Sequence, residues 1–381
     1  AFISGGKEYQ DRIDILFDFM TQKGDEDDAD FSYRKFQNLY DFELKAGKDV
    51  ILDTLWKKLT HPTMREAWLE VKRMYDTLVA WYEDSMYYHY VGFLTTQGKT
   101  LHDIVTGIEK AKKDENGEEI KPWTREHIET ALKRLMAQTF NEMTAVRPED
   151  IDGWTYNGNN DIRGLLLLMN VETYKQTKYQ RFPFHSYIKE KWDIEHIDSQ
   201  NEATGLRASE DRLRWMRLTS DILMKEHHAI PNEKEAKALA EELTSVVREK
   251  TENGAIEDKD VKGLDSIYPT LYVKVVEHYS GKISEQQGNK HALGNLTLLD
   301  TALNRSYQDA PFPYKRQCVM DTDLRGDKFV PMCTKNVFLK FYTNSNSSAS
   351  FLDSMRWNKQ DQDNYLAAIH KVVDPIFETN I

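Results

Sequence analysis

Apolar residues recur at helical spacing through the first part of the chain. In residues 13–20, 71–82 and 101–108 they are three or four positions apart over successive turns, which places them on one face of a helix. Each stretch is predicted to be an amphipathic helix that buries this face in a core.

Two further segments carry different helical signals. Thr124 stands where a side-chain cap would open a helix over residues 125–140. Residues 162–169 are apolar nearly all round, which predicts a helix buried on every side. Together these patterns predict that residues 1–180 form an α-helical bundle.

Aromatic residues are frequent in the predicted helices between positions 68 and 90. They could form a surface on which bases stack, but aromatic side chains at helical spacing indicate a core far more often. We therefore expect a packing role for the group Trp68, Tyr75, Trp81, Tyr82, Tyr87, Tyr88 and Tyr90.

The pattern changes after residues 181–184, where proline and aromatic residues interrupt the helical spacing. Residues 192–197 are predicted to be a strand, and 296–299 a second strand. Between them lies an insert at about 198–290 that contains polar helices. We predict a second domain over 181–381. Because helical patterns outnumber the two short strands, the predicted fold class is mainly α with one small β-hairpin.

Several helices are predicted within the second domain. The insert includes a helical pattern over 233–250, and further helices are predicted near 314–320, 337–342 and 364–377. A chain of 381 residues is also longer than one compact core usually accommodates, which agrees with two domains.

Composition excludes several classes of protein. No apolar run approaches the roughly 20 residues that span a bilayer, so no membrane role is expected. The two cysteines, Cys318 and Cys333, form no CxxC pair, which argues against a disulfide framework or a thiolate zinc site. A cytoplasmic location is expected.

The chain starts at Ala1 rather than at a methionine. We therefore expect a processed product or a fragment of a longer protein.

Charge is distributed unevenly along the chain. The net charge of -12 argues against a uniformly basic surface that coats nucleic acid. From Arg305 to Lys340, however, seven basic residues stand against four acidic ones. A second basic group follows the first predicted strand and comprises Arg207, Arg212, Arg214, Arg217 and Lys225.

The two predicted strands carry residues suited to phosphodiester hydrolysis. His196 has an imidazole whose usual pKa lets it accept a proton from water at neutral pH. Glu195 and Asn304 offer oxygen ligands, which suit Mg²⁺ or Mn²⁺ better than zinc. Since adjacent strand residues point to opposite faces, Glu195 and His196 can serve one site only if the backbone turns or bulges there.

Other residues near these positions have two interpretations each. Asn295 can bond to backbone and hold the loop that carries His196, which is an orienting role. Asp193 is a further candidate metal ligand or an exposed strand residue. His291 either touches the scissile phosphate or caps the second strand, and the structural role is favoured. Lys315 and Arg316 could hold phosphate or form a solvated helix face.

The spacing of these residues resembles the HNH, or ββα-metal, module at the C-terminus of GmrSD-like, modification-dependent (type IV) restriction endonucleases. The matching segments are residues 194–200, residues 291–299 with the sequence HALGNLTLL, Asn304, and the Phe-x-x-Lys element at 312–315. Weaker similarity in the first hundred residues resembles the helical region that links the two halves of such proteins.

This resemblance implies a fold and a function. The chain would be a helical bundle followed by an HNH nuclease domain with a helical insert. His196 would be the general base, Glu195 and Asn304 the metal ligands, and Asn295 the residue that positions the histidine loop. In this family a ParB-like nucleotide-hydrolysing domain with an Asp-Gly-Gln-Gln-Arg motif comes first, and this sequence lacks that motif.

The resulting hypothesis is a Mg²⁺- or Mn²⁺-dependent DNA endonuclease that restricts modified foreign DNA, such as that of phages. One alternative is a DNA-sensing or DNA-binding module that no longer cuts. Another is an HNH ribonuclease toxin, because nothing in the residues distinguishes DNA from RNA. The intact set of Glu195, His196, Asn295 and Asn304 favours an active nuclease.

Overall fold

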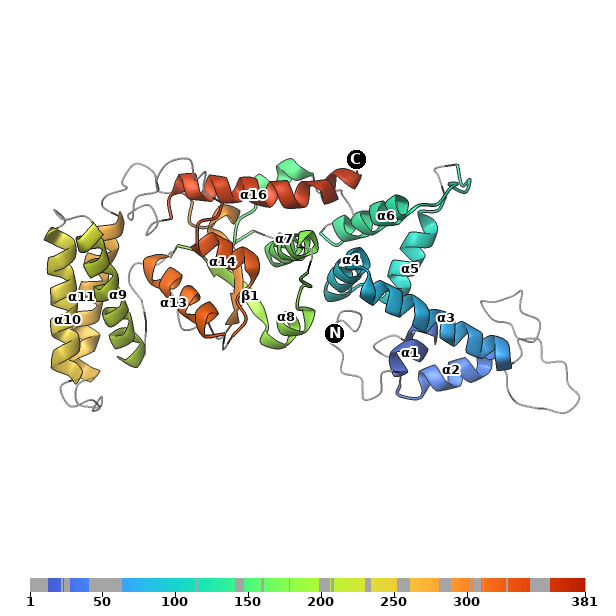
Figure 1. Cartoon of the computed structure of the whole chain (residues 1–381), viewed down its shortest axis with the longest axis horizontal. Helices are drawn as coiled ribbons and strands as arrows, with labels where there is room; N and C mark the ends of the chain where they lie inside the picture. The colour runs from blue at the N-terminus through green and yellow to red at the C-terminus, as the bar shows by residue number, and fades with distance from the viewer. Residues whose placement is uncertain are drawn as a thin grey trace, which may run out of the picture. The chain divides into compact units, whose positions relative to one another are not determined.

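The chain folds into a mainly helical structure, as the sequence predicts (Figure 1). Its computed structural model describes residues 13–21, 23, 28–40, 64–113, 116–140, 147–158, 161–177, 179–198, 206, 209–229, 234–251, 261–280, 289–301, 303, 310, 312–326, 328–342 and 357–380. Within these residues the β-structure is one two-stranded antiparallel sheet and isolated bridges. None of the described helices is long and apolar enough to cross a membrane.

The chain divides into two compact units. The first comprises residues 1–142 and 177–185, and the second comprises 143–176 and 186–379. The boundary predicted near residue 180 thus falls in a segment, 177–185, that returns to the first unit.

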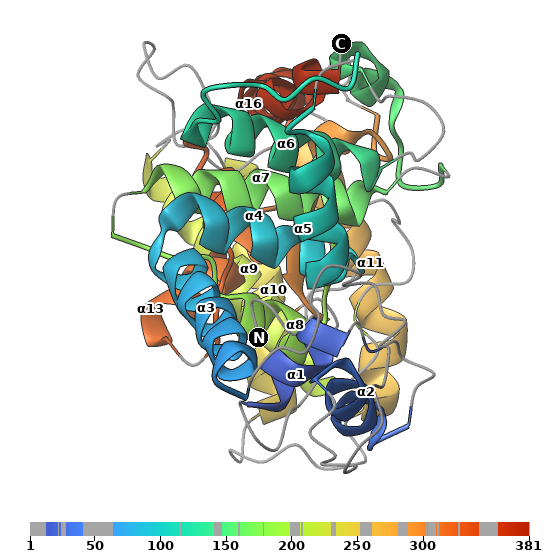
Figure 2. The same ribbon diagram turned by 90° about the vertical axis from the view of Figure 1, so that its right-hand side faces the viewer.

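The first unit is built of helices. Their bounds are α1 (Asp14–Thr21), α2 (Phe31–Tyr40), α3 (Met64–Glu83), α4 (Ser85–Thr96), α5 (Leu101–Lys110) and α6 (Arg125–Gln138). The core element is α4, which is buried almost throughout and packs against α5 and α6 (Figure 2). The predicted helices over 13–20, 71–82, 101–108 and 125–140 are confirmed, and Thr124 caps α6 by accepting a hydrogen bond from the His127 backbone NH.

Hydrogen bonds attach the returning segment 177–185 to α4. The Tyr88 hydroxyl donates to the Phe182 carbonyl at 3.0 Å, and the Phe182 backbone NH donates to His89 Nε2 at 3.1 Å. Arg181 lies over the rings of Tyr82 and Tyr88, 4.5 and 5.0 Å from their centroids. The segment therefore belongs to the first unit although it follows the first helix of the second.

The expectation that all the aromatic residues between 68 and 90 form core is wrong for part of the set. Trp81, Tyr88 and Tyr90 are buried. Trp68, Tyr75 and Tyr82 lie seven residues apart on α3 and are about half exposed, at 53%, 55% and 51%. The buried face of α3 instead includes Val71, Leu78 and Trp81.

The second unit contains the sheet and the remaining helices. Its elements are η1 (Pro148–Gly153), α7 (Ile162–Gln176), most of α8 (Phe184–Glu190), β1 (Trp192–His196), α9 (Ser209–Ala229), α10 (Lys234–Thr251), α11 (Val261–Ser280), η2 (Leu293–Asn295), β2 (Leu296–Asp300), α13 (Phe312–Arg325), α14 (Met332–Phe338), α16 (Lys359–Phe377) and η3 (Glu378–Asn380). Both predicted strands and the helices predicted near 233–250, 314–320 and 364–377 are confirmed. The helix predicted over 337–342 lies earlier, as α14.

Helix α7 is the centre of the second unit. It packs against α14, α16 and both strands, which explains why residues 162–169 carry no polar stripe (Figure 1). Asn170 is polar within this core, and its amide is satisfied: it donates to the Leu166 carbonyl at 2.9 Å and accepts from the Cys333 backbone NH at 3.2 Å. The buried helix prediction is confirmed.

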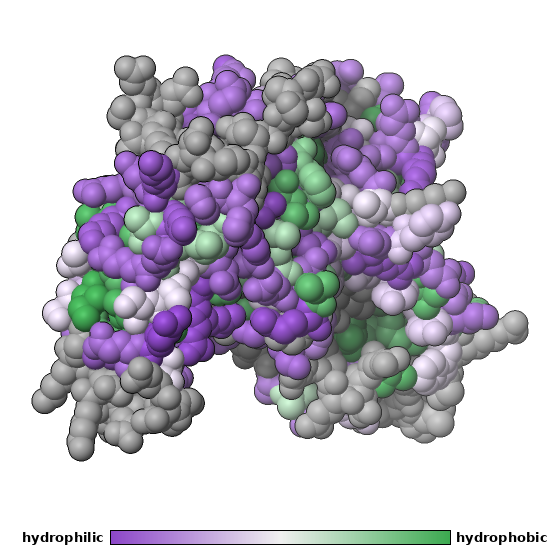
Figure 3. Space-filling view, turned by 60° about the vertical axis from the view of Figure 1, so that its left-hand side comes forward, coloured by the Kyte–Doolittle hydropathy of each residue, from purple (hydrophilic) through white to green (hydrophobic). Residues whose placement is uncertain are grey.

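Between β1 and β2 the insert forms a bundle of α9, α10 and α11 (Figure 1). Its core includes Trp215 of α9, whose ring packs edge-on against Tyr268 of α11 at a centroid distance of 5.3 Å. Hydrophilic residues cover most of the described surface in Figure 3, and hydrophobic residues appear there as separate patches. The insert is thus a packed helical element between the two strands that carry the motifs.

Gly294 lies where η2 meets α16, and a side chain there has no room. A Cβ at this position would approach the Gln362 backbone carbonyl oxygen to 2.6 Å. Gly294→Ala should therefore lower the free energy of unfolding by about 1–3 kcal/mol, because backbone must shift to relieve the contact. Chemical denaturation monitored by circular dichroism measures this change.

Gly153→Ala is the matched control for Gly294→Ala. Nothing lies within 4 Å of a Cβ built at Gly153, so its substitution should change stability by less than about 0.5 kcal/mol. Equal stabilities for the two variants would show that α16 does not pack closely on the Gly294 loop.

Candidate active site

The two predicted strands pair with each other, which joins the motifs that the insert separates in sequence. The strands β1 and β2 are antiparallel, with Glu195 opposite Thr297 and His196 opposite Leu296. The register runs through five consecutive pairs without a bulge. Glu195 and His196 therefore point to opposite faces of the strand, and the bulge that would bring both side chains to one face is absent from these five pairs.

Asn295 fixes the backbone around the end of β1. Its Nδ2 donates to the carbonyls of Asp198 and Lys290 at 3.0 and 2.9 Å, and its Oδ1 accepts from the Asp198 backbone NH at 3.0 Å. The side chain is fully buried, so these bonds replace water completely. One amide thus ties the segment after His196 to the loop before β2.

His196 lies in a partly buried pocket of aromatic rings. The Tyr156 ring meets it edge-on at a centroid distance of 4.6 Å, and the His291 ring lies 6.1 Å away. Burial, and then the nearby charges of Lys315 and His291, lower the pKa of His196 from 6.5 to about 4. The imidazole is therefore neutral at physiological pH, which is the form that can accept a proton.

Tyr156 is a site residue that the sequence did not indicate. Its backbone NH donates to the His291 carbonyl at 2.9 Å, and Asn157 Nδ2 lies 3.4 Å from His291 Nδ1. The Tyr156 side chain is 44% exposed. The Tyr156–Asn157 turn thus joins the site through tertiary contacts, and its Asn-Gly-rich sequence signals only a turn.

Glu195 is paired with Lys315 of α13. The Lys315 ammonium donates to Glu195 Oε1 and to the His196 backbone carbonyl, the second bond at 2.8 Å. The side chains of Lys315 and Glu195 are 1% and 6% exposed. Lys315 is thus buried beside Glu195 and does not form part of a solvated helix face, which was one of its two interpretations.

The remaining candidates divide between the site and other contacts. Asp193 is 46% exposed and pairs with Arg163 of α7 at 2.7 Å, so its carboxylate has a partner outside the His196 pocket. Arg316 follows Lys315 on α13. Its Nε is buried without a hydrogen-bond partner among the described residues, and burial lowers its pKa. Asn304 lies outside the described residues.

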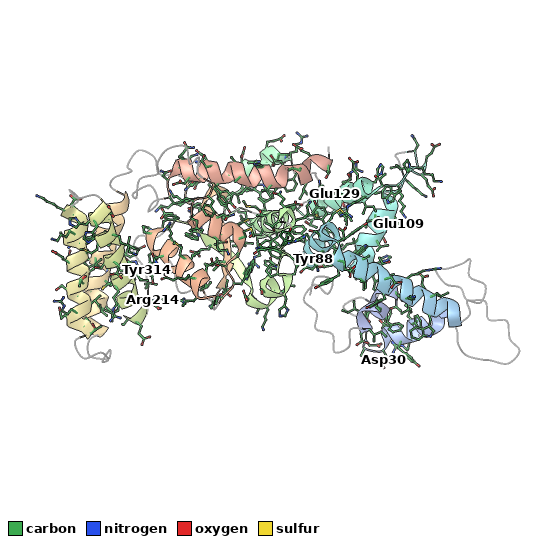
Figure 4. The ribbon with its side chains drawn as sticks, in the orientation of Figure 1. Asp30, Tyr88, Glu109, Glu129, Arg214 and Tyr314 are labelled. Carbon is green, nitrogen blue, oxygen red and sulfur yellow. The ribbon has the colours of Figure 1, made fainter. Side chains whose placement is uncertain are left out.

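Acidic residues lie close to several members of the basic group after β1. Arg212 pairs with Asp265, and its guanidinium lies 5.1 Å from the Tyr268 ring centroid. Arg214 and Arg217 line a hollow of about 460 Å³ between α9 and α13 together with Asp221 and other residues of both charges. Arg214 and Tyr314 are labelled where these two helices face each other (Figure 4). Arg207 lies outside the described residues.

Comparison with known proteins supports the family resemblance. Residues 229–371 match the family model described as GmrSD restriction endonucleases, C-terminal domain. The matched segment is similar to the C-terminal domain of these endonucleases. This match indicates a nuclease of the restriction type. It covers Asn295 and Lys315 but begins after Glu195 and His196, so the first motif is supported by strand pairing rather than by the match. Comparisons with curated proteins and with solved structures gave no match.

The oxygen atoms around the Lys315 ammonium are the donors that the predicted divalent cation would require. The described residues hold no group of three or more His, Cys, Asp or Glu side chains placed to bind a metal. The Lys315 ammonium, however, is a cation held between a carboxylate oxygen and a carbonyl oxygen. Oxygen donors of this kind are the ones that Mg²⁺ and Mn²⁺ prefer.

The neutral state of His196 can be tested by its titration. The His196 resonance in NMR spectra of the folded protein should show no protonation between pH 8 and about 5 and should titrate near pH 4, because burial disfavours the charged form. In denatured protein every histidine should titrate near 6.5. Folded stability linked to His196 is then present above pH 6.5 and is lost as pH falls toward 4.

The His196→Ala variant assigns the resonance in this experiment. A midpoint for His196 between pH 6 and 7 in the folded state would contradict the buried environment and the neutral form.

Proposed function

We propose that the second unit is an HNH endonuclease that depends on Mg²⁺ or Mn²⁺ and hydrolyses the phosphodiester bonds of DNA. Three observations support this: the GmrSD-type match, the pairing of the motif strands, and the Asn295 clamp between them. The observation with the greatest weight is the pairing of β1 with β2, which brings Glu195 and His196 beside the segment that matches the family.

The ββα arrangement is part of the proposal. After β2, Thr301 and Leu303 are helical, and the Leu303 backbone NH donates to Asp300 Oδ1 at 2.9 Å, as at the start of a helix. From the family resemblance we propose that Asn304 holds the cation together with Glu195. Asp193, paired with Arg163, is the weaker candidate for a ligand.

In this mechanism His196 accepts the proton of the attacking water. A divalent cation, when bound, supplies positive charge to the phosphate and its leaving oxygen. Asn295 holds the His196 loop at a fixed distance from the strand that leads to Asn304. His291 and Tyr156 confine the imidazole from the side, which restricts the orientation of its proton-accepting nitrogen.

Arg316 is the residue proposed to contact phosphate most directly. A partly buried guanidinium whose Nε–H has no acceptor among the described residues is costly unless an anion approaches it. Phosphate oxygens accept from arginine in the geometry that such a donor requires.

On the basis of the family resemblance, we extend the proposal to modified foreign DNA as substrate and to cooperation with a ParB-like nucleotide-hydrolysing domain.

His196→Ala should reduce plasmid nicking and linearisation by about 10²–10⁴-fold, because the base that activates water is lost. The assay compares Mg²⁺, Mn²⁺ and EDTA on modified and unmodified plasmid DNA. His228→Ala, on the exposed surface of α9, is the matched control and should cut like the wild type. Full activity of His196→Ala would remove the base assignment. Binding without cutting by the wild type in every metal would favour a DNA-sensing module.

Asn304→Ala should raise the concentration of Mg²⁺ or Mn²⁺ required for half-maximal cleavage several-fold, because one oxygen ligand is lost. Asn364→Ala on α16 is the control, since Asn364 bonds to Gln360 on its own helix. A metal titration of Asn304→Ala identical to that of the wild type would take Asn304 off the list of ligands. The same assay on RNA tests the ribonuclease alternative.

A further inference from the structure

Lys315 lies almost completely inside the protein with both of its described partners. Its ammonium donates to a Glu195 carboxylate oxygen and to the His196 backbone carbonyl oxygen. The side chain is 1% exposed, and that of Glu195 is 6% exposed. A buried carboxylate and a buried ammonium each lose a large hydration energy, so each needs the other while no further charge is present.

The Lys315 ammonium holds one oxygen of the carboxylate that a divalent cation would bind. The predicted metal ligand Glu195 is the residue that the ammonium holds. Two cations bound to one carboxylate lie only a few ångströms apart, and in a water-poor site their repulsion is strong. Simultaneous tight binding of both cations to Glu195 is therefore unfavourable.

We propose that Lys315 is a built-in cation that holds Glu195 until a divalent cation takes the carboxylate, so that metal binding releases the Lys315 ammonium. The proposal rests on the function proposed above and adds a positioning residue to it. Once released from Glu195, the Lys315 ammonium lacks an ion-pair partner. The phosphate of the proposed substrate can then become its partner. Metal binding and phosphate binding would then favour each other.

A second buried pair shows what a purely structural lysine does in this fold. Lys340 pairs with Asp361 at 2.6 Å, and their side chains are 10% and 7% exposed. Asp361 also accepts from the Asn358 backbone NH at 2.9 Å as part of the capping box of α16. This pair has similar burial and charge, but its carboxylate is committed to a helix end. Lys340 is therefore a matched control for Lys315.

The first experiment measures Mn²⁺ affinity by isothermal titration calorimetry on the full chain, without DNA. Lys315→Met should bind Mn²⁺ at least tenfold more tightly than the wild type, because the competing charge is gone. Lys340→Met should bind like the wild type. Glu195→Gln should bind weakly, and adding Lys315→Met to it should restore nothing, since the lysine acts through Glu195. Thermal unfolding in EDTA should show Lys315→Met destabilised, with a larger upward shift on adding Mn²⁺ than in the wild type.

A second experiment uses the wild-type protein and does not depend on the folding of a variant. Reductive methylation followed by peptide mass spectrometry reports how accessible each lysine amine is. Lys315 should be protected in EDTA and become at least severalfold more reactive at saturating Mn²⁺, whereas Lys340 should stay protected under both conditions.

The outcomes separate this inference from the proposed function. If the wild type binds Mn²⁺ but Lys315→Met binds it no more tightly, or if Mn²⁺ leaves Lys315 protected, the exchange is wrong and the metal-dependent nuclease stands. If neither the wild type nor Lys315→Met binds Mn²⁺, the exchange falls together with the metal dependence of the proposed function.

Discussion

The antiparallel pairing of β1 with β2 is the constraint on which the second unit depends. A sheet of two short strands is only marginally stable alone, so both strands must be covered by other elements. Helices α7 and α14 supply this cover, and every residue of β2 is buried. Thr334 of α14 donates to the Leu298 carbonyl at 2.5 Å and lies 2.9 Å from the Thr297 hydroxyl, which fixes α14 to the strand. The site is therefore held by the same contacts that form the core.

The clearest features of the fold were those whose cause is local. Thr124 stands at the start of α6 because its side chain satisfies a backbone NH of the first turn, and this depends only on neighbouring residues. The burial of α7 on all sides also follows from its nearly continuous run of apolar residues.

The burial of the aromatic residues of α3 was harder to predict, because helical spacing defines the faces of a helix without saying which face is covered. Trp81 and Tyr75 both fit a core pattern, and only tertiary packing separates them.

The site residues that belong to a sequence motif could be predicted. The residues that join the site only through tertiary contacts could not. Glu195, His196 and Asn295 stand out in sequence, and their strands do pair. The partner of Glu195 could not be read from the chain, because the Phe-x-x-Lys element gives no indication that its lysine turns inward. Tyr156 was missed for a similar reason: it meets His196 through a turn bonded to His291, far away in sequence.

The arrangement of charge limits how the proposed nuclease can bind a polyanion. A count of basic residues around the site suggests a positive surface, but several of these residues are paired with carboxylates of the same chain. Lys328 pairs with Asp300, Lys335 with Asp323, and Arg212 with Asp265. Long-range attraction of DNA is correspondingly weak in a chain of net charge -12. Recognition must then rest on short, directed contacts at the strand ends. At these strand ends, the proton-accepting imidazole of His196 and the proposed exchange of Lys315 for a divalent cation at Glu195 contribute more to substrate binding and cleavage than the total charge of the chain.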